Sequence, residues 1–132
     1  MRAILIAILA APLLAIPADA HHSFAAEYDA TKPIAFTGTV TKVEWMNPHV
    51  RFFLDVKDDR GNTTSWELTM GSATGLMRRG WTRDLLKPGI TVKVDGYRAR
   101  DGSQLANLRT IVFADGRRMF TGAPPDAPGG NQ

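Results

Sequence analysis

The chain contains no cysteine among its 132 residues. This absence excludes disulfide bonds, thiolate metal ligands and a cysteine nucleophile. Histidine is scarce, with three residues, and no uncharged apolar run reaches the roughly 20 residues that a membrane-spanning helix needs. The formal net charge is +3, but the lysines and arginines are dispersed along the chain. That dispersal is typical of a solvated surface, and we expect no nucleic-acid partner.

The first 20 residues have the features of an export signal. Arg2 supplies a positive charge, Ala3 to Ile16 form an uncharged apolar run of 14 residues, and Ala18-Asp19-Ala20 is a small-residue cleavage motif. We therefore expect cleavage after Ala20 and a periplasmic or secreted protein, the alternative being an uncleaved anchor. Removal of 20 residues from 132 leaves 112, which suits one domain with a modest core and no membrane-spanning segment.

Alternating apolar and polar residues predict strands after a polar N-terminal arm at residues 21–33. We expect this arm to be partly ordered, with Phe24 and Tyr28 as candidate anchors onto the domain. The first strand begins at Ile34, and its parity slips between Val40 and Val43, which indicates a β-bulge near Gly38. In the third strand, parity places Trp66 inside and Thr69 outside. Beyond the first, strands are expected at Val50–Lys57, Thr63–Met70, Ile90–Arg98 and Leu105–Phe113, with a short terminal strand at Arg118–Phe120.

A short helix is expected between the third and fourth strands, where Ser72 or Thr74 can cap its start and Gly80 can end it. Three strands, a helical connection and two further strands match the OB-fold, a five-stranded Greek-key barrel. We therefore predict an all-β, OB-fold-like barrel with a short helical insertion over residues 34–120, the alternative being a small open β-sandwich. Residues 121–132 are rich in proline and glycine and are predicted to be a disordered tail.

Several motifs resemble a family of small exported bacterial proteins of uncharacterised function. They are His21-His22-Ser23-Phe24 after the signal, Asn47-Pro48-His49, Gly80-Trp81-Thr82-Arg83, Leu86-Lys87-Pro88-Gly89 and the segment Gly96-Tyr97-Arg98-Ala99-Arg100-Asp101-Gly102. The resemblance implies a periplasmic, single-domain β protein. It implies no catalytic residue.

The histidines are the candidate metal ligands. Cleavage after Ala20 would give His21 a free α-amine, next to the imidazole of His22. Copper(II) favours such nitrogen ligands, and two arrangements are open: amine, His21 ring and His49, or amine, amide nitrogen and His22 ring. Met46 could add a thioether for Cu(I). The alternative is that the N-terminal histidines are solvated, that His49 bonds only backbone, and that Met46 packs.

Two aromatic residues are candidates for a ligand or partner surface. Phe53 lies on the otherwise polar face of its strand, and Trp45 lies at the end of the preceding strand. OB barrels bind ligands on such a face. Core packing is the expected role of Trp66 and Trp81.

No catalytic constellation is visible in the sequence. The serines lack a nucleophile-elbow motif, and no pair of carboxylates is marked by its spacing. The sequence therefore favours a non-enzymatic periplasmic binding protein that holds copper through His21, His22 and His49 and stores it or delivers it to a metal-trafficking partner. The alternative is a metal-free envelope adaptor that binds a protein or glycan through Phe53. The sequence does not indicate an oligomeric state.

Overall fold

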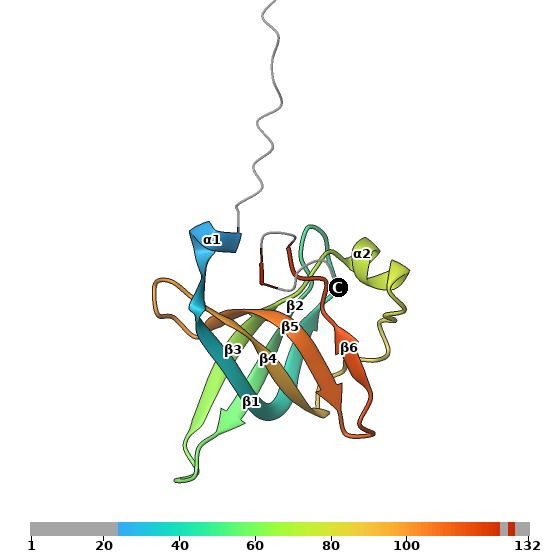
Figure 1. Ribbon diagram of the computed structural model, residues 1–132. Coiled ribbons are helices and arrows are strands. Elements are labelled where there is room, and N and C mark those ends of the chain that lie inside the picture. Colours follow the sequence, from blue (N-terminus) through green and yellow to red (C-terminus); the bar gives the residue numbers. More distant parts are fainter. Residues whose placement is uncertain (1–23, 125–126, 129–132) are drawn as a thin grey trace, which may run out of the picture.

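The computed structural model describes residues 24–124 and 127–128 (Figure 1). Its helices and strands are α1 (Phe24–Glu27), β1 (Tyr28–Glu44), β2 (Arg51–Lys57), β3 (Thr63–Thr69), α2 (Ala73–Arg78), β4 (Thr91–Ala99), β5 (Leu105–Phe113) and β6 (Arg118–Phe120). No helix in this part of the chain is long and apolar enough to cross a membrane.

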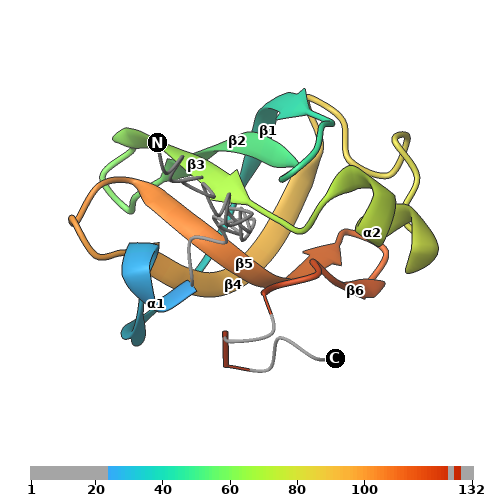
Figure 2. The same ribbon diagram turned by 90° about the horizontal axis from the view of Figure 1, so that it is seen from above.

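The strands close into the predicted OB-like barrel. Along the sheet the order is β3-β2-β1-β4-β5-β6, and a parallel pairing of β3 with β5 joins its two sides. That pairing brings Leu68 opposite Ala106 and Thr69 opposite Asn107. Viewed from above, the strands surround the interior, and α2 and β6 lie together on one side (Figure 2). The five-stranded barrel with a helical insertion between β3 and β4 is therefore confirmed, with β6 added to the edge of β5.

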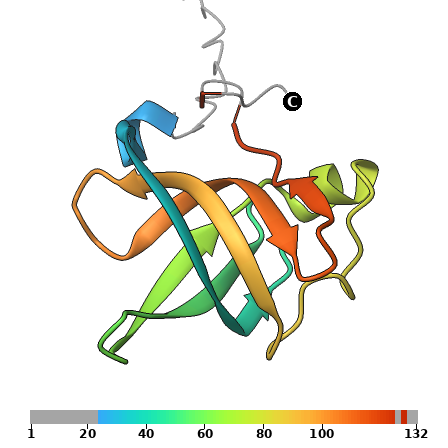
Figure 3. The same ribbon diagram turned by 60° about the horizontal axis from the view of Figure 1, so that its bottom comes forward.

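The long strand β1 belongs to both halves of the barrel (Figure 3). Its first part pairs with β4 and its last part with β2, and the register shifts between Val40 and Lys42. This is the predicted bulge. At Gly38 an added Cβ would lie 2.6 Å from the Asp55 carbonyl oxygen, so only glycine permits this close approach of β1 to β2.

The barrel interior holds the main core. Its fully buried side chains come from every strand of the barrel and from the α2 region, and they include Phe52, Leu68, Leu76, Val94 and Leu108. Ser72 caps α2, because its Oγ accepts a hydrogen bond from the Gly75 backbone N–H at 3.0 Å.

The N-terminal segment is anchored by Phe24 and Tyr28 as expected, but its regular structure begins earlier than predicted. β1 begins at Tyr28, six residues before Ile34, and α1 precedes it. Phe24 and Tyr28 are buried, their ring centroids are 5.5 Å apart, and Tyr97 packs edge-on against Phe24. These aromatic rings bury apolar area outside the barrel, which anchors residues 24–33.

The C-terminal segment is also packed where it is described. Thr121 is fully buried, and its carbonyl accepts a hydrogen bond from the Gly71 N–H at 2.7 Å. Ala127 is buried in the cluster of Phe24, Tyr28 and Tyr97. The prediction of a disordered tail from Thr121 onward is therefore wrong for these residues, because the aromatic cluster gives them an apolar surface to cover.

One expectation from parity in β3 is wrong. Trp66 packs against the main core as predicted, although it is half-buried, with Arg98 above its ring at 5.2 Å. Thr69 is buried instead of solvated, because Tyr28 and Asn107 cover its hydroxyl from outside the barrel.

Candidate functional site

A pocket of about 270 Å³ lies at the end of the barrel where α1 is attached. We call it the end pocket. Three segments form most of its wall. The N-terminal segment contributes Glu27 and Tyr28, and the loop between β1 and β2 contributes Met46, Pro48 and His49. The last part of β3 contributes Glu67 and Thr69, and Arg51 and Leu105 complete the wall. Segments far apart in the sequence therefore meet here.

His49 is held in one orientation by the backbone. Its Nδ1 lies 3.2 Å from the carbonyl oxygen of Met70. Because a carbonyl can only accept, Nδ1 of the neutral ring carries the proton, and Nε2 keeps its lone pair. His49 is otherwise exposed, so Nε2 is accessible to a metal ion.

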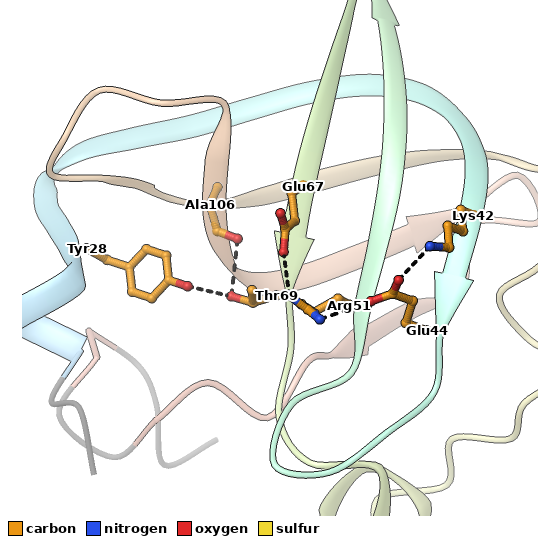
Figure 4. A network of polar contacts seen from close by, with 7 residues as sticks. All are labelled: Tyr28, Lys42, Glu44, Arg51, Glu67, Thr69 and Ala106. Atoms are coloured by element: carbon orange, nitrogen blue, oxygen red, sulfur yellow. Dashed lines mark hydrogen bonds and ion pairs between the residues drawn. The ribbon is translucent and has the colours of Figure 1, made fainter. Parts of the chain in front are cut away.

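Thr69 is the centre of a buried polar network in the pocket wall (Figure 4). Its hydroxyl donates to the Ala106 carbonyl at 3.3 Å and therefore accepts from the Tyr28 hydroxyl at 2.9 Å. The Asn107 amide also donates to it, at 3.2 Å. Burial raises the pKa of Tyr28 to about 12. Tyr28 is therefore protonated at neutral pH and available as a donor.

A row of ion pairs crosses the outer face of β1, β2 and β3 beside the pocket (Figure 4). The Arg51 guanidinium lies 3.2 Å from a Glu44 carboxylate oxygen and 3.1 Å from one of Glu67. The Lys42 ammonium lies 2.6 Å from Glu44, and it lowers the pKa of that carboxyl. Two cations thus balance two anions, which leaves this wall close to neutral.

The chain belongs to a family of unknown function. The family, DUF6152, matches residues 9–107, which include every residue that lines the end pocket. The expected resemblance to an uncharacterised family is therefore confirmed. A search of curated proteins found no match to this DUF6152 protein.

Among solved structures, the DUF6152 protein is similar to the mitochondrial single-stranded DNA binding protein Rim1 of S. cerevisiae. The two share 13% sequence identity, and the TM-score is 0.48. The alignment covers 63% of this chain and 94% of the Rim1 chain.

The structure brings together only part of the predicted metal site. His49 and Met46 line the end pocket, whereas His21 and His22 lie outside the described residues. Within residues 24–124 and 127–128, no group of three or more histidine, aspartate or glutamate side chains is placed to hold a metal ion.

The predicted aromatic surface of the DUF6152 protein is less open than expected. Phe53 is half-buried on the outer face of β2, and the Lys42 ammonium lies 5.4 Å from the centre of its ring. Trp45 packs against the main core, and its Nε1 is buried with no hydrogen-bond partner in the described part of the chain. Trp81 is a core residue as predicted.

The sequence analysis missed Tyr28 and Thr69 as pocket residues. Tyr28 belongs to a segment interpreted as a polar arm, and Thr69 has the parity of a solvent-facing residue. The one available signal was the aromatic spacing of Phe24 and Tyr28, four residues apart, which is compatible with a short anchored turn.

Proposed function

We propose that the protein is an exported, non-enzymatic binding protein that holds a copper ion in the end pocket through His49 and the N-terminal histidines. The observation that carries the proposal is that His49 and the N-terminal segment line the same pocket. The β2–β3 face and the loop between strands one and two are also where OB barrels bind ligands in general.

The reach of the chain supports a shared site. Phe24 is 3% exposed and is fixed by contacts with Tyr28 and Tyr97. His22 precedes Phe24 by two residues in the sequence. α1 and the loop carrying His49 lie at the same end of the barrel (Figure 1).

The chemistry of the available donors favours copper. His49 offers a free imidazole nitrogen, and Met46, 41% exposed at the same pocket, offers a thioether. Imidazole and amine nitrogens suit Cu(II), and thioether sulfur suits Cu(I). Export with cleavage after Ala20 would supply the α-amine of His21.

The surroundings of His49 support a non-catalytic role for the end pocket. It is the one histidine of residues 24–124 and 127–128, and its Nδ1 contacts a backbone carbonyl rather than a carboxylate. A general base in a nucleophile-activating triad has its second nitrogen oriented by an acidic side chain. We therefore assign the pocket to binding, with storage or delivery of the ion to a metal-trafficking partner as its role.

A Cu(II) titration of the exported protein tests the proposal. We expect a visible d–d band that saturates at one equivalent, and affinity at least about tenfold lower in His49→Ala, as for loss of one good ligand. Asn47→Ala is the matched control, because Asn47 is exposed in the same loop but does not line the pocket. Unchanged affinity both in His49→Ala and in a protein with one extra residue ahead of His21 would refute the shared site.

A second candidate function is a metal-free envelope adaptor that binds a protein or glycan across the outer face of β1, β2 and β3. Phe53 favours it, because its ring is still half-exposed among paired charges. Capture of one defined envelope component that is lost in Phe53→Ala but retained without the three histidines would favour this function over copper binding.

A further inference from the structure

A second pocket, of about 390 Å³, lies between the end of α2 and strand β6. Arg79, Arg118, Met119 and Phe120 line it. We call it the α2–β6 pocket. It shares no lining residue with the end pocket, and neither copper binding nor the adaptor function uses it.

The aromatic wall of the α2–β6 pocket is exposed and yet firmly held. Phe120 is 42% exposed. Its carbonyl accepts a hydrogen bond from Nε1 of the buried Trp81 at 2.8 Å. The next residue, Thr121, is fully buried, and its N–H donates to the Arg109 carbonyl at 3.1 Å. The backbone on both sides of the ring is therefore fixed, and an apolar ligand would meet a preorganised surface.

The guanidinium of Arg118 is weakly paired. The guanidinium of Arg118 lies 3.7 Å from a carboxylate oxygen of Asp95, the longest of that carboxylate's three contacts. Asp95 already accepts hydrogen bonds from Arg109, at 2.8 Å, and from the Thr110 hydroxyl. One carboxylate thus faces two guanidiniums. The side chain of Arg118 is 60% exposed, so exchanging its ion pair with Asp95 for another anion costs little free energy.

We infer that the α2–β6 pocket binds an organic anion that carries an apolar chain. Arg118 contacts the anionic head, a carboxylate or phosphate group, because a guanidinium can donate two parallel hydrogen bonds to either. Phe120, which lies on the same face of β6 as Arg118, covers the chain. The volume is in the range of pockets that take small molecules.

Titration calorimetry with dodecyl phosphate, kept below its micelle concentration, tests this inference in the full-length protein. We expect one molecule to bind, about tenfold more weakly in Arg118→Gln and in Phe120→Ala, which is the scale of a charge-assisted hydrogen bond or a buried ring. Arg60→Gln, which removes an exposed arginine from the β2–β3 loop, is the matched control and should bind within about twofold of the wild type.

Three results would overturn the inference. The first is equal affinity of the wild type, Arg118→Gln and Phe120→Ala, with thermal unfolding showing all three folded. The second is inorganic phosphate binding as tightly as dodecyl phosphate, since the apolar chain would then contribute nothing. The third is binding to phosphatidylglycerol vesicles without binding of monomeric dodecyl phosphate, which would assign the arginines to a membrane surface. Copper plays no part in any of these measurements.

Discussion

Thr69 is the side chain on which the wall of the end pocket depends. It takes part in three hydrogen bonds, with Tyr28, Ala106 and Asn107, and it is only 8% exposed. A valine there keeps the shape but leaves the Tyr28 hydroxyl and the Asn107 amide without their acceptor. Buried polar groups that lose a partner cost about 1–3 kcal/mol each.

We therefore predict that Thr69→Val lowers the free energy of unfolding by about 2 kcal/mol in urea denaturation. Thr64→Val, at an exposed position on the same strand, is the control and should change it by less than about 0.5 kcal/mol. Equal effects of the two substitutions would show that the network contributes no stability.

The ionisation of Tyr28 gives a prediction at high pH. Burial raises its pKa from 10.0 to about 12, so between these values the unfolded chain releases a proton that the folded chain keeps. The folded state then binds more protons, and stability falls as pH rises through this range. Tyr28→Phe should lose stability less steeply between pH 10 and pH 12, as measured by urea denaturation at several pH values. The same slope in both proteins would contradict a raised pKa.

The strands that alternate cleanly were predicted from the sequence. β4, β5 and β6 begin and end within one residue of the predicted bounds, and the bulge in β1 lies where the parity slips. Period-two alternation locates a strand when one face is wet and the other dry. Residue types located the start of α2 less sharply: Ser72 and Thr74 were both candidate caps, and Ser72 is the cap.

The same alternation failed where contacts are non-local. The pairing of β3 with β5 joins residues about 38 positions apart, such as Leu68 and Ala106, and Thr69 bonds Tyr28, 41 positions away. No local sequence pattern predicts that contact. The end pocket was therefore predicted only in the part that histidine and methionine mark, namely His49 and Met46.

β4 and β5 approach each other closely at Asn107, which bonds Thr69 in the wall of the end pocket. The register shifts at Gly96, where an added Cβ would collide with the Asn107 carbonyl and lie 2.8 Å from the Cα of Leu108. Both obstacles are backbone, so β5 itself must move.

Gly96→Ala should therefore lower the free energy of unfolding by about 3 kcal/mol. It should also shift the NMR signals of Asn107 and Thr69. Thr91→Ala, exposed on the same strand, is expected to cost less than about 1 kcal/mol. An unshifted Thr69 signal in Gly96→Ala would contradict the link between this glycine and the pocket wall.

The two ends of the described chain meet outside the barrel. Ala127 and the half-buried Ala123 cover Phe24, Tyr28 and Tyr97, the aromatic cluster that anchors the N-terminal segment. The C-terminal segment therefore stabilises the end of the molecule where α1 lies, which is also where the end pocket opens.

Truncation after Thr121 should expose this cluster. We expect the free energy of unfolding to fall by about 1–2 kcal/mol, the value of burying a few apolar groups, and 1-anilinonaphthalene-8-sulfonate fluorescence to rise. Truncation after Pro128 keeps Ala127 and is the control. If both truncations behave like the full chain, the C-terminal segment contributes nothing to the packing of the N-terminal one.

The proposal for the whole molecule is that export creates a copper site from the new N-terminus and the pocket at the end of the barrel. Native mass spectrometry of the exported protein, after one equivalent of Cu(II) and removal of excess metal, tests this most directly. The account predicts a chain that begins at His21 and carries one copper ion, which His49→Ala loses at the same chelator concentration. A chain that begins elsewhere, or equal copper retention by wild type and His49→Ala, would contradict it.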